Sequence, residues 1–307
     1  MRTDTMAERE TKTDGFRVSR RSVLAVSGAA VAGGLGLAST GALGQSSQMS
    51  SRQFTVRIEN VSDGDTLQTT AMGDAADQPV PLTPFVWAVH SRDEPIFDTK
   101  EAEWDNGLEE LAEDGSPGKL ANYLANRDTV VESGLAAIPE GADGPGPLTP
   151  GHAYEFSFEV MGGKPDLYLS FVSMFIPSND LFYAIGGPDG LRLFGPGNSP
   201  TSGNVTDHVS LWDTGTEINE EPGVGENQPQ RQRGAGVGLV ERDTVVPIES
   251  VNGYHYPATE DVLDVMITPN RSRLDGSTTG FRSLSLVQST AHTDTPRYIN
   301  RMIKPQT

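Results

Sequence analysis

The sequence predicts an all-β protein, an antiparallel β-sandwich with a short helical insertion. Short runs of alternating apolar and polar residues recur along the chain, and clusters of Gly, Pro, Asn and Asp separate them. The chain has 34 Gly and 21 Pro, and only 36% of its residues are hydrophobic, which is typical of a loop-rich β protein. Regular helical patterns do not alternate with these runs, so an antiparallel arrangement is favoured over a parallel sheet.

The first expected strand, Phe54 to Val61, shows the two-residue period of a strand with one buried face. Similar or more continuously apolar runs predict the remaining strands. These are Phe85 to Val89, Tyr154 to Val160, Leu167 to Ile176, Leu191 to Phe194, Val209 to Trp212, Thr244 to Ile248 and Val262 to Ile267.

One region has a helical pattern instead. Trp104, Leu108 and Leu111 fall at positions i, i+4 and i+7, which places them in one apolar stripe. Ser116-Pro117 then offers an N-cap and a proline at the first position of a second helix, which we expect to run to Asn126. We expect both helices to pack over one end of the sandwich.

The N-terminus resembles a twin-arginine export signal. Arg20 and Arg21 precede an uncharged run from Val23 to Gly44, which ends in the small-residue site Ala42-Leu43-Gly44. A run of this length could also remain as a membrane anchor, but its six Gly favour cleavage. We therefore expect a secreted or cell-surface protein with no membrane span after the signal is removed.

The remaining chain divides into three parts. Residues 45–52 form a Ser/Gln-rich linker, residues 53–269 form the sandwich domain, and residues 270–307 form a C-terminal extension. Within the domain, the segment from Glu220 to Gly238 is too rich in Gly and Pro for a strand or helix interior, so we expect a long ordered loop.

Composition excludes several functions. The chain has no Cys, which excludes disulfide scaffolds, zinc–thiolate sites and thiol nucleophiles. Its 42 Asp and Glu against 23 Lys and Arg give a net charge of −19, which argues against binding to nucleic acid. A surface this acidic repels itself at low ionic strength but is screened at molar salt, so it suits a saline environment.

Two apolar strands end in acidic turns. One leads into Ser178-Asn179-Asp180, and the other leads into Asp213, Gly215 and Glu217. If the Leu191 to Phe194 strand lies between them in a meander, both turns emerge at the same end of the sheet. Clustered carboxylates need a compensating cation, and a site made only of oxygen ligands suits Ca²⁺. Ordinary turn residues on an acidic protein are the alternative reading.

These segments resemble the spondin domain, known from F-spondin and from many secreted prokaryotic proteins. The resemblance covers about residues 53–269 and is most specific at Trp212-Asp213-Thr214-Gly215-Thr216-Glu217. Support comes from Phe54 to Val61, Leu82 to His90, Gly107 to Gly115 and Ser178 to Phe182. It implies an antiparallel sandwich similar to calcium-dependent membrane-targeting domains, with one Ca²⁺ at a loop end. The implied ligands are Asp180, Asp213 and Glu217, with Trp212 packed behind them. The animal pattern has Asp at the last position, so Glu217 is a departure.

The resemblance also implies adhesion to an extracellular matrix or cell-surface protein or glycan. Enzyme signatures are weak: the five His residues show no paired metal-ligand spacing, and no Gly-x-Ser-x-Gly elbow occurs. We therefore expect a noncatalytic protein. An exported metal-assisted hydrolase and a metal-free structural envelope protein are the alternatives. Asn60, Asn204 and Asn270 lie in glycosylation sequons, and Asn60, near a strand end, is the least suited to modification.

Overall fold

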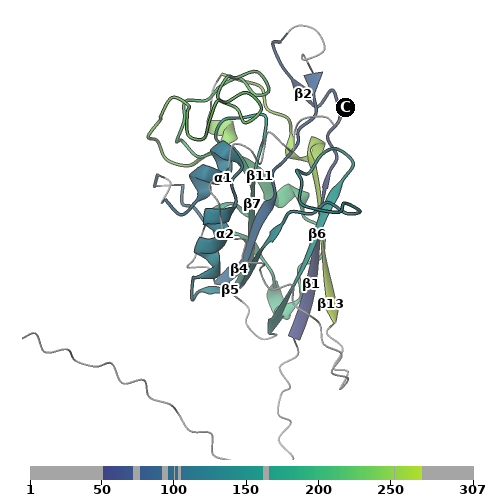
Figure 1. The fold of residues 1–307 in the computed structure, drawn as a ribbon. Helices are drawn as coiled ribbons and strands as arrows, with labels where there is room; N and C mark the ends of the chain where they lie inside the picture. Colours follow the sequence, from purple (N-terminus) through teal and green to yellow (C-terminus); the bar gives the residue numbers. More distant parts are fainter. Residues whose placement is uncertain are drawn as a thin grey trace, which may run out of the picture. The chain divides into compact units, whose positions relative to one another are not determined.

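The computed structural model describes residues 51–71, 77–91, 96–99, 101–102, 105–161, 166–251 and 253–271, all within one compact unit. The expected export signal, most of the linker, Trp104 and nearly all of the C-terminal extension lie outside these residues. The described part is mostly β, with two antiparallel sheets that face each other (Figure 1). The predicted all-β, sandwich-like character is therefore confirmed.

The smaller sheet shows the predicted alternation most clearly. In β1, Phe54, Val56 and Ile58 are buried against the larger sheet, while the residues between them are only partly buried. Polar and apolar faces alternate in the same way along β6. The sheet has the order β10 (Gly203–Asn204), β13 (Leu263–Arg271), β1 (Ser51–Asn60) and β6 (Ala153–Met161).

The larger sheet carries the two acidic turns. Its order is β12 (Val246–Pro247), β11 (Val209–Asp213), β8 (Leu181–Ile185), β7 (Leu167–Met174), β4 (Phe85–Ser91) and β5 (Val130–Ala136), and β9 (Leu191–Arg192) pairs with β7 beside this path. A separate pair consists of β2 (Leu67–Gln68) and β3 (Asp77–Gln78). The structure thus adds β2, β3, β5, β8 and β10, which the sequence did not predict, and it shortens the expected strands around residues 191–194 and 244–248.

Aromatic rings fill the space between the sheets. Trp87 of β4 stacks on Phe156 of β6 with ring centroids 4.8 Å apart, and Phe85 of β4 meets Tyr154 of β6 edge-on with ring centroids 6.0 Å apart. Gly134 of β5 leaves room for Trp87, because a Cβ at this glycine would lie 2.7 Å from the indole ring. These contacts hold the two sheets together by burying large apolar surfaces.

Helices α1 (Leu108–Asp114) and α2 (Gly118–Ala125) cover the outer face of the larger sheet (Figure 1). Leu108 and Leu111 are buried there, as their spacing predicted. The expectation that the helices cap one end of the sandwich is wrong. The larger sheet is covered on both faces, so all eight residues of β7 are buried, and the strand lacks polar alternation.

Short 3₁₀ turns link several strands, and the segment from Glu220 to Gly238 contains neither helix nor strand, as predicted. None of the described helices has the length and apolar character needed to cross a membrane. The 3₁₀ turns are Gly187–Asp189, Pro196–Asn198, Thr206–His208, Ile248–Ser250 and Thr259–Asp261.

Candidate metal centre

Strand pairing brings Asp180 and Asp213 together. Strands β8 and β11 are antiparallel neighbours, and Asp213, the last residue of β11, pairs with Leu181, the first residue of β8. Asp180 directly precedes Leu181, so both carboxyl groups lie at the same end of the sheet. The strand between β7 and β11 is β8, and the sequence-based expectation that residues 191–194 fill this place is wrong, because β9 pairs with β7 elsewhere.

Asp180 is fully buried, and one of its carboxyl oxygens lacks a partner. Its Oδ2 accepts a hydrogen bond from the Glu217 backbone N–H at 3.2 Å, but Oδ1 has no hydrogen-bond partner among the described residues. Burial, together with the nearby Asp213 carboxylate, raises the pKa of Asp180 well above its ordinary value. An ionised Asp180 therefore needs a positive charge that the described side chains do not supply.

Asp213 is held by the turn that follows it. Its Oδ1 accepts the Gly215 N–H at 2.6 Å, and its Oδ2 accepts a hydrogen bond from the Asn219 side-chain amide. Gly215 adopts a left-handed φ of 68°, a backbone conformation that favours glycine, and this curls the chain back toward Asp213. The neighbouring Trp212 packs on the opposite face of the sheet, against Phe97 at 5.0 Å.

Glu217 lies beside this pair but directs its carboxylate elsewhere. Its Oε1 accepts the Gly238 N–H at 2.8 Å, and its Oε2 accepts a hydrogen bond from the Asn179 amide at 3.2 Å. Burial raises the pKa of Glu217, although these two hydrogen bonds oppose the increase. The structure therefore places the backbone of Glu217 on Asp180 and its side chain in a separate hydrogen-bonded position.

Two further buried carboxyl groups come from the end of helix α1. Glu113 and Asp114 are 5% and 6% exposed, and burial raises the pKa of Glu113 to about 8. Glu113 hydrogen-bonds to Thr216, and the charge of Glu217 contributes to its raised pKa. Sequence reasoning did not single out these two residues. A signal was available, because acidic side chains at a helix C-terminus oppose the helix dipole.

The buried carboxyl groups of this region together form what we call the acidic cluster, which comprises Glu113, Asp114, Asp180, Asp213 and Glu217. No Lys or Arg of the described residues forms an ion pair with any of them. Uncompensated buried carboxylates are costly, so they must be protonated or bind a cation.

Two neutral groups add oxygen atoms near Asp213. The Oδ1 of Asn219 is buried without a partner among the described residues, as is the hydroxyl of Tyr256. Burial raises the pKa of Tyr256, and the charges of Asp213 and Asp180 raise it further. Sequence reasoning missed both residues, because neither lies in an acidic turn.

These oxygen atoms meet part of the requirement for binding a hard cation. Asp180 Oδ1 and Asn219 Oδ1 are buried oxygens that lack hydrogen-bond donors, and Asp213 supplies a carboxylate beside them. Carboxylate and amide oxygens are the ligands that Ca²⁺ prefers. Within the described residues, however, no three His, Asp or Glu side chains converge closely enough to form a metal-binding group. The carboxylate of Glu217 would have to leave Asn179 and Gly238 to become the third.

Comparison with known families and with curated proteins finds no match for this sequence. The resemblance to the spondin domain therefore rests on the motifs themselves.

Proposed function

We propose that this chain is an exported, noncatalytic, calcium-binding domain of the spondin type that attaches to an extracellular matrix or cell-surface protein or glycan. The observation that carries the proposal is the juxtaposition of Asp180 and Asp213, two buried carboxyl groups with one unpartnered oxygen and no basic partner. The motif that contains Asp213 resembles the family's calcium-binding segment. The finer fold assignment, a sandwich similar to calcium-dependent membrane-targeting domains, is part of the same proposal.

Four side chains would hold the ion. Asp180 and Asp213 supply carboxylate oxygens, and Asn219 supplies an amide oxygen already turned away from other donors. Glu217 completes the set by turning its carboxylate toward Asp180, whose Oδ2 its own backbone N–H already contacts at 3.2 Å. The positive charge of a bound Ca²⁺ supplies the compensation that the acidic cluster lacks.

The role of the ion in this proposal is structural. Asp180 belongs to the β7–β8 turn, and Asp213 and Glu217 belong to the segment that leads into the long loop of residues 220–238. A cation held by both segments would fix the loop relative to the sheet edge. The fixed loops at this end of the sandwich would then form the surface that meets the matrix or cell-surface partner.

Calorimetric titration with Ca²⁺ at high salt tests the proposal. We expect one ion per chain in the wild type, with a dissociation constant as weak as about 10⁻⁴–10⁻³ M, the range of extracellular modules. Asp213→Ala should abolish the heat of binding, and Asp207→Ala, an exposed aspartate in the 3₁₀ turn before β11, serves as the matched control.

The two alternatives give different results in the same experiment. A metal-free envelope protein would show no binding heat and no calcium-dependent change in thermal midpoint for either form. A metal-assisted hydrolase would bind the metal and, in addition, would cleave a polysaccharide or phosphate ester in a reaction that Asp213→Ala abolishes.

A further inference from the structure

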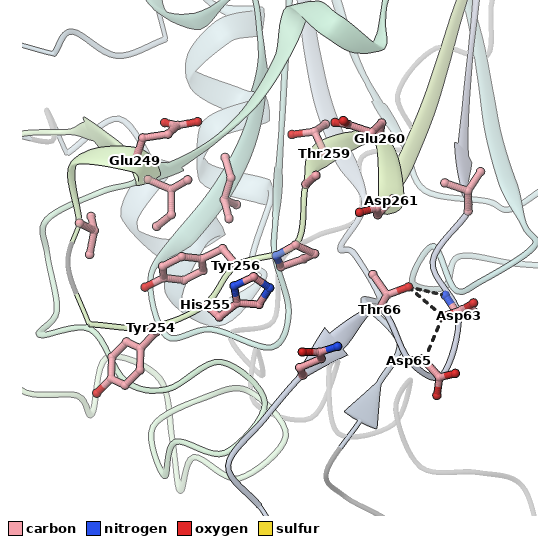
Figure 2. A pocket seen from close by; sticks show the side chains of 17 residues that line it. Asp63, Asp65, Thr66, Glu249, Tyr254, His255, Tyr256, Thr259, Glu260 and Asp261 are labelled. Carbon is pink, nitrogen blue, oxygen red and sulfur yellow. Dashed lines mark hydrogen bonds between the residues drawn. The ribbon is translucent and has the colours of Figure 1, made fainter.

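A groove of about 990 Å³ opens at one end of the sandwich, where β1 ends and β13 begins. The turn between β1 and β2 forms one side of it, and residues 254–261 form much of the remainder (Figure 2). The groove is separate from the proposed ligands, but Tyr256 is common to both descriptions: it lines the groove, and the charges of Asp213 and Asp180 raise its pKa.

The rim of the groove is strongly negative. Among the described lining residues there are five carboxylates and no Lys or Arg. Figure 2 shows Glu249 on one side and Asp63 and Asp65 on the other, with Glu260 and Asp261 above them in this view.

Hydrogen bonds fix one of these charges in place. Asp63 Oδ1 accepts the Asp65 N–H at 2.9 Å and the Thr66 hydroxyl at 3.0 Å. These bonds lower the pKa of Asp63, so this carboxylate is ionised at neutral pH. The β1–β2 turn therefore presents a negative charge to the groove in a defined position.

The floor of the groove is apolar and aromatic. Val61, Leu211, Ile248 and Val251 contribute aliphatic surface. Tyr254, His255 and Tyr256 follow one another along the wall, and Tyr254 is 41% exposed. Carboxylates accept hydrogen bonds, and aromatic faces attract guanidinium and ammonium groups. The groove therefore suits a ligand that carries several cationic groups flanked by apolar side chains, and a neutral sugar would leave its charges uncompensated.

The chain itself contains such a segment. Residues 272–307 lie outside the described part, but their sequence holds five Arg and Lys against two Asp, in a protein whose net charge is −19. The run from Arg297 to Lys304 reads Arg-Tyr-Ile-Asn-Arg-Met-Ile-Lys, so its three cationic residues are separated by short, mostly apolar stretches. This pattern complements the acidic rim and apolar floor of the groove.

The chain between the end of strand β13 and the basic run is long enough to return to the groove. Strand β13 begins next to the groove and ends at Arg271, opposite Arg52 of β1. Its nine residues span about 30 Å at 3.3 Å per residue. The 25 residues between Arg271 and Arg297 can span up to about 85 Å when extended, so the basic run can return to the groove of its own chain.

We propose that the groove lined by Asp63, Glu249, Tyr254 and Glu260 binds the basic segment Arg297–Lys304 of the same chain. Arg297 and Arg301 contact the carboxylates and the tyrosine rings, and the intervening apolar side chains cover Val61 and Ile248. The contact covers the acidic groove, and a cationic segment of another protein would have to displace it to bind there. It does not depend on a metal ion.

Carbodiimide coupling of the full chain, followed by mass spectrometry, tests this inference. The reagent joins a lysine amine to a carboxylate only where the two are in contact. We expect Lys304 coupled to Glu249, Glu260 or Asp261 within one chain, in chelator and at low salt. Lys119, whose Nζ lies 2.6 Å from Glu110, provides an internal positive control in every sample.

Substitutions that leave every reactive group in place then separate specific from accidental contact. Arg297→Gln with Arg301→Gln should reduce the Lys304 products at least fivefold, whereas Arg273→Gln with Arg282→Gln, which removes the same charge, should not. Absence of Lys304 products alongside the Lys119–Glu110 product would overturn the inference, as would equal yields in the two double variants. In an equimolar mixture of ¹⁴N- and ¹⁵N-labelled chains, mixed-isotope Lys304 products as frequent as random pairing of chains predicts would assign the groove to a second copy and overturn binding within one chain.

Discussion

Replacement of Asp180 by Asn probes the acidic cluster directly. The substitution keeps the size of the side chain and an acceptor for the Glu217 N–H, but it removes a charge that is fully buried beside Asp213. Without metal, we expect Asp180→Asn to be at least as stable as the wild type, because the raised pKa of Asp180 shows that its ionised form opposes folding.

Calcium should reverse this order. With a dissociation constant of about 10⁻⁴–10⁻³ M, free Ca²⁺ at about 10 mM stabilises the folded wild type by about 1.4–2.7 kcal/mol. For a domain of this size each kcal/mol raises the thermal midpoint by about 2–4 °C, so the wild type should gain about 3–11 °C. Asp180→Asn should gain nothing.

Differential scanning calorimetry in Ca²⁺ and in chelator measures both effects. Asp207→Asn is the matched control and should show the full wild-type gain. Equal midpoints in calcium and chelator for the wild type would refute the reasoning. So would a gain in Asp180→Asn as large as in the wild type.

Three further predictions address neighbouring features. Burial raises the pKa of Glu113 to about 8, so the free energy of unfolding of the metal-free wild type should fall by up to about 3 kcal/mol as pH rises from about 4.5 to 7. Glu113→Gln should remove this pH dependence. Urea unfolding in chelator that gives the same pH slope for both forms would contradict this. Glu217→Gln should weaken calcium binding at least about tenfold, or about 1.4 kcal/mol, in a calorimetric titration; an unchanged affinity would remove Glu217 from the ligand set. Gly134→Ala places a Cβ 2.7 Å from the Trp87 ring and should cost about 1–3 kcal/mol of stability, and an unaltered urea midpoint would show that the two sheets pack differently here.

The sequence predicted the strands of the sandwich best where one face of a strand is exposed to solvent. β1 and β6 alternate because the outer face of the smaller sheet is exposed, and both were predicted nearly to their ends. β8 was missed because all five of its residues are buried, and a short continuous apolar run carries no period that separates strand from loop or helix. The position of the helices could not be inferred either, because nothing in their sequence states which face of the sheet they cover.

Some residues of the candidate site could be predicted from local sequence patterns, and others could not. Asp180 and Asp213 could be paired from the sequence because each ends an apolar run, although the strand between them was misassigned. The direction of the Glu217 carboxylate depends on Asn179 and on Gly238, which lie 38 and 21 residues from it along the chain. Contacts of that kind depend on loop paths that no local pattern encodes. Asn60 was expected to escape glycosylation, and its amide is buried and hydrogen-bonded to the carbonyls of Val80 and Leu148.

A crystal structure of the full chain grown in calcium, with anomalous scattering data, tests the calcium site most directly. We expect one anomalous peak within about 2.3–2.6 Å of carboxylate oxygens from both Asp180 and Asp213, with the Glu217 side chain turned toward it. Clear density for the two carboxyl groups in direct contact, with no ion between them at saturating calcium, would contradict the account.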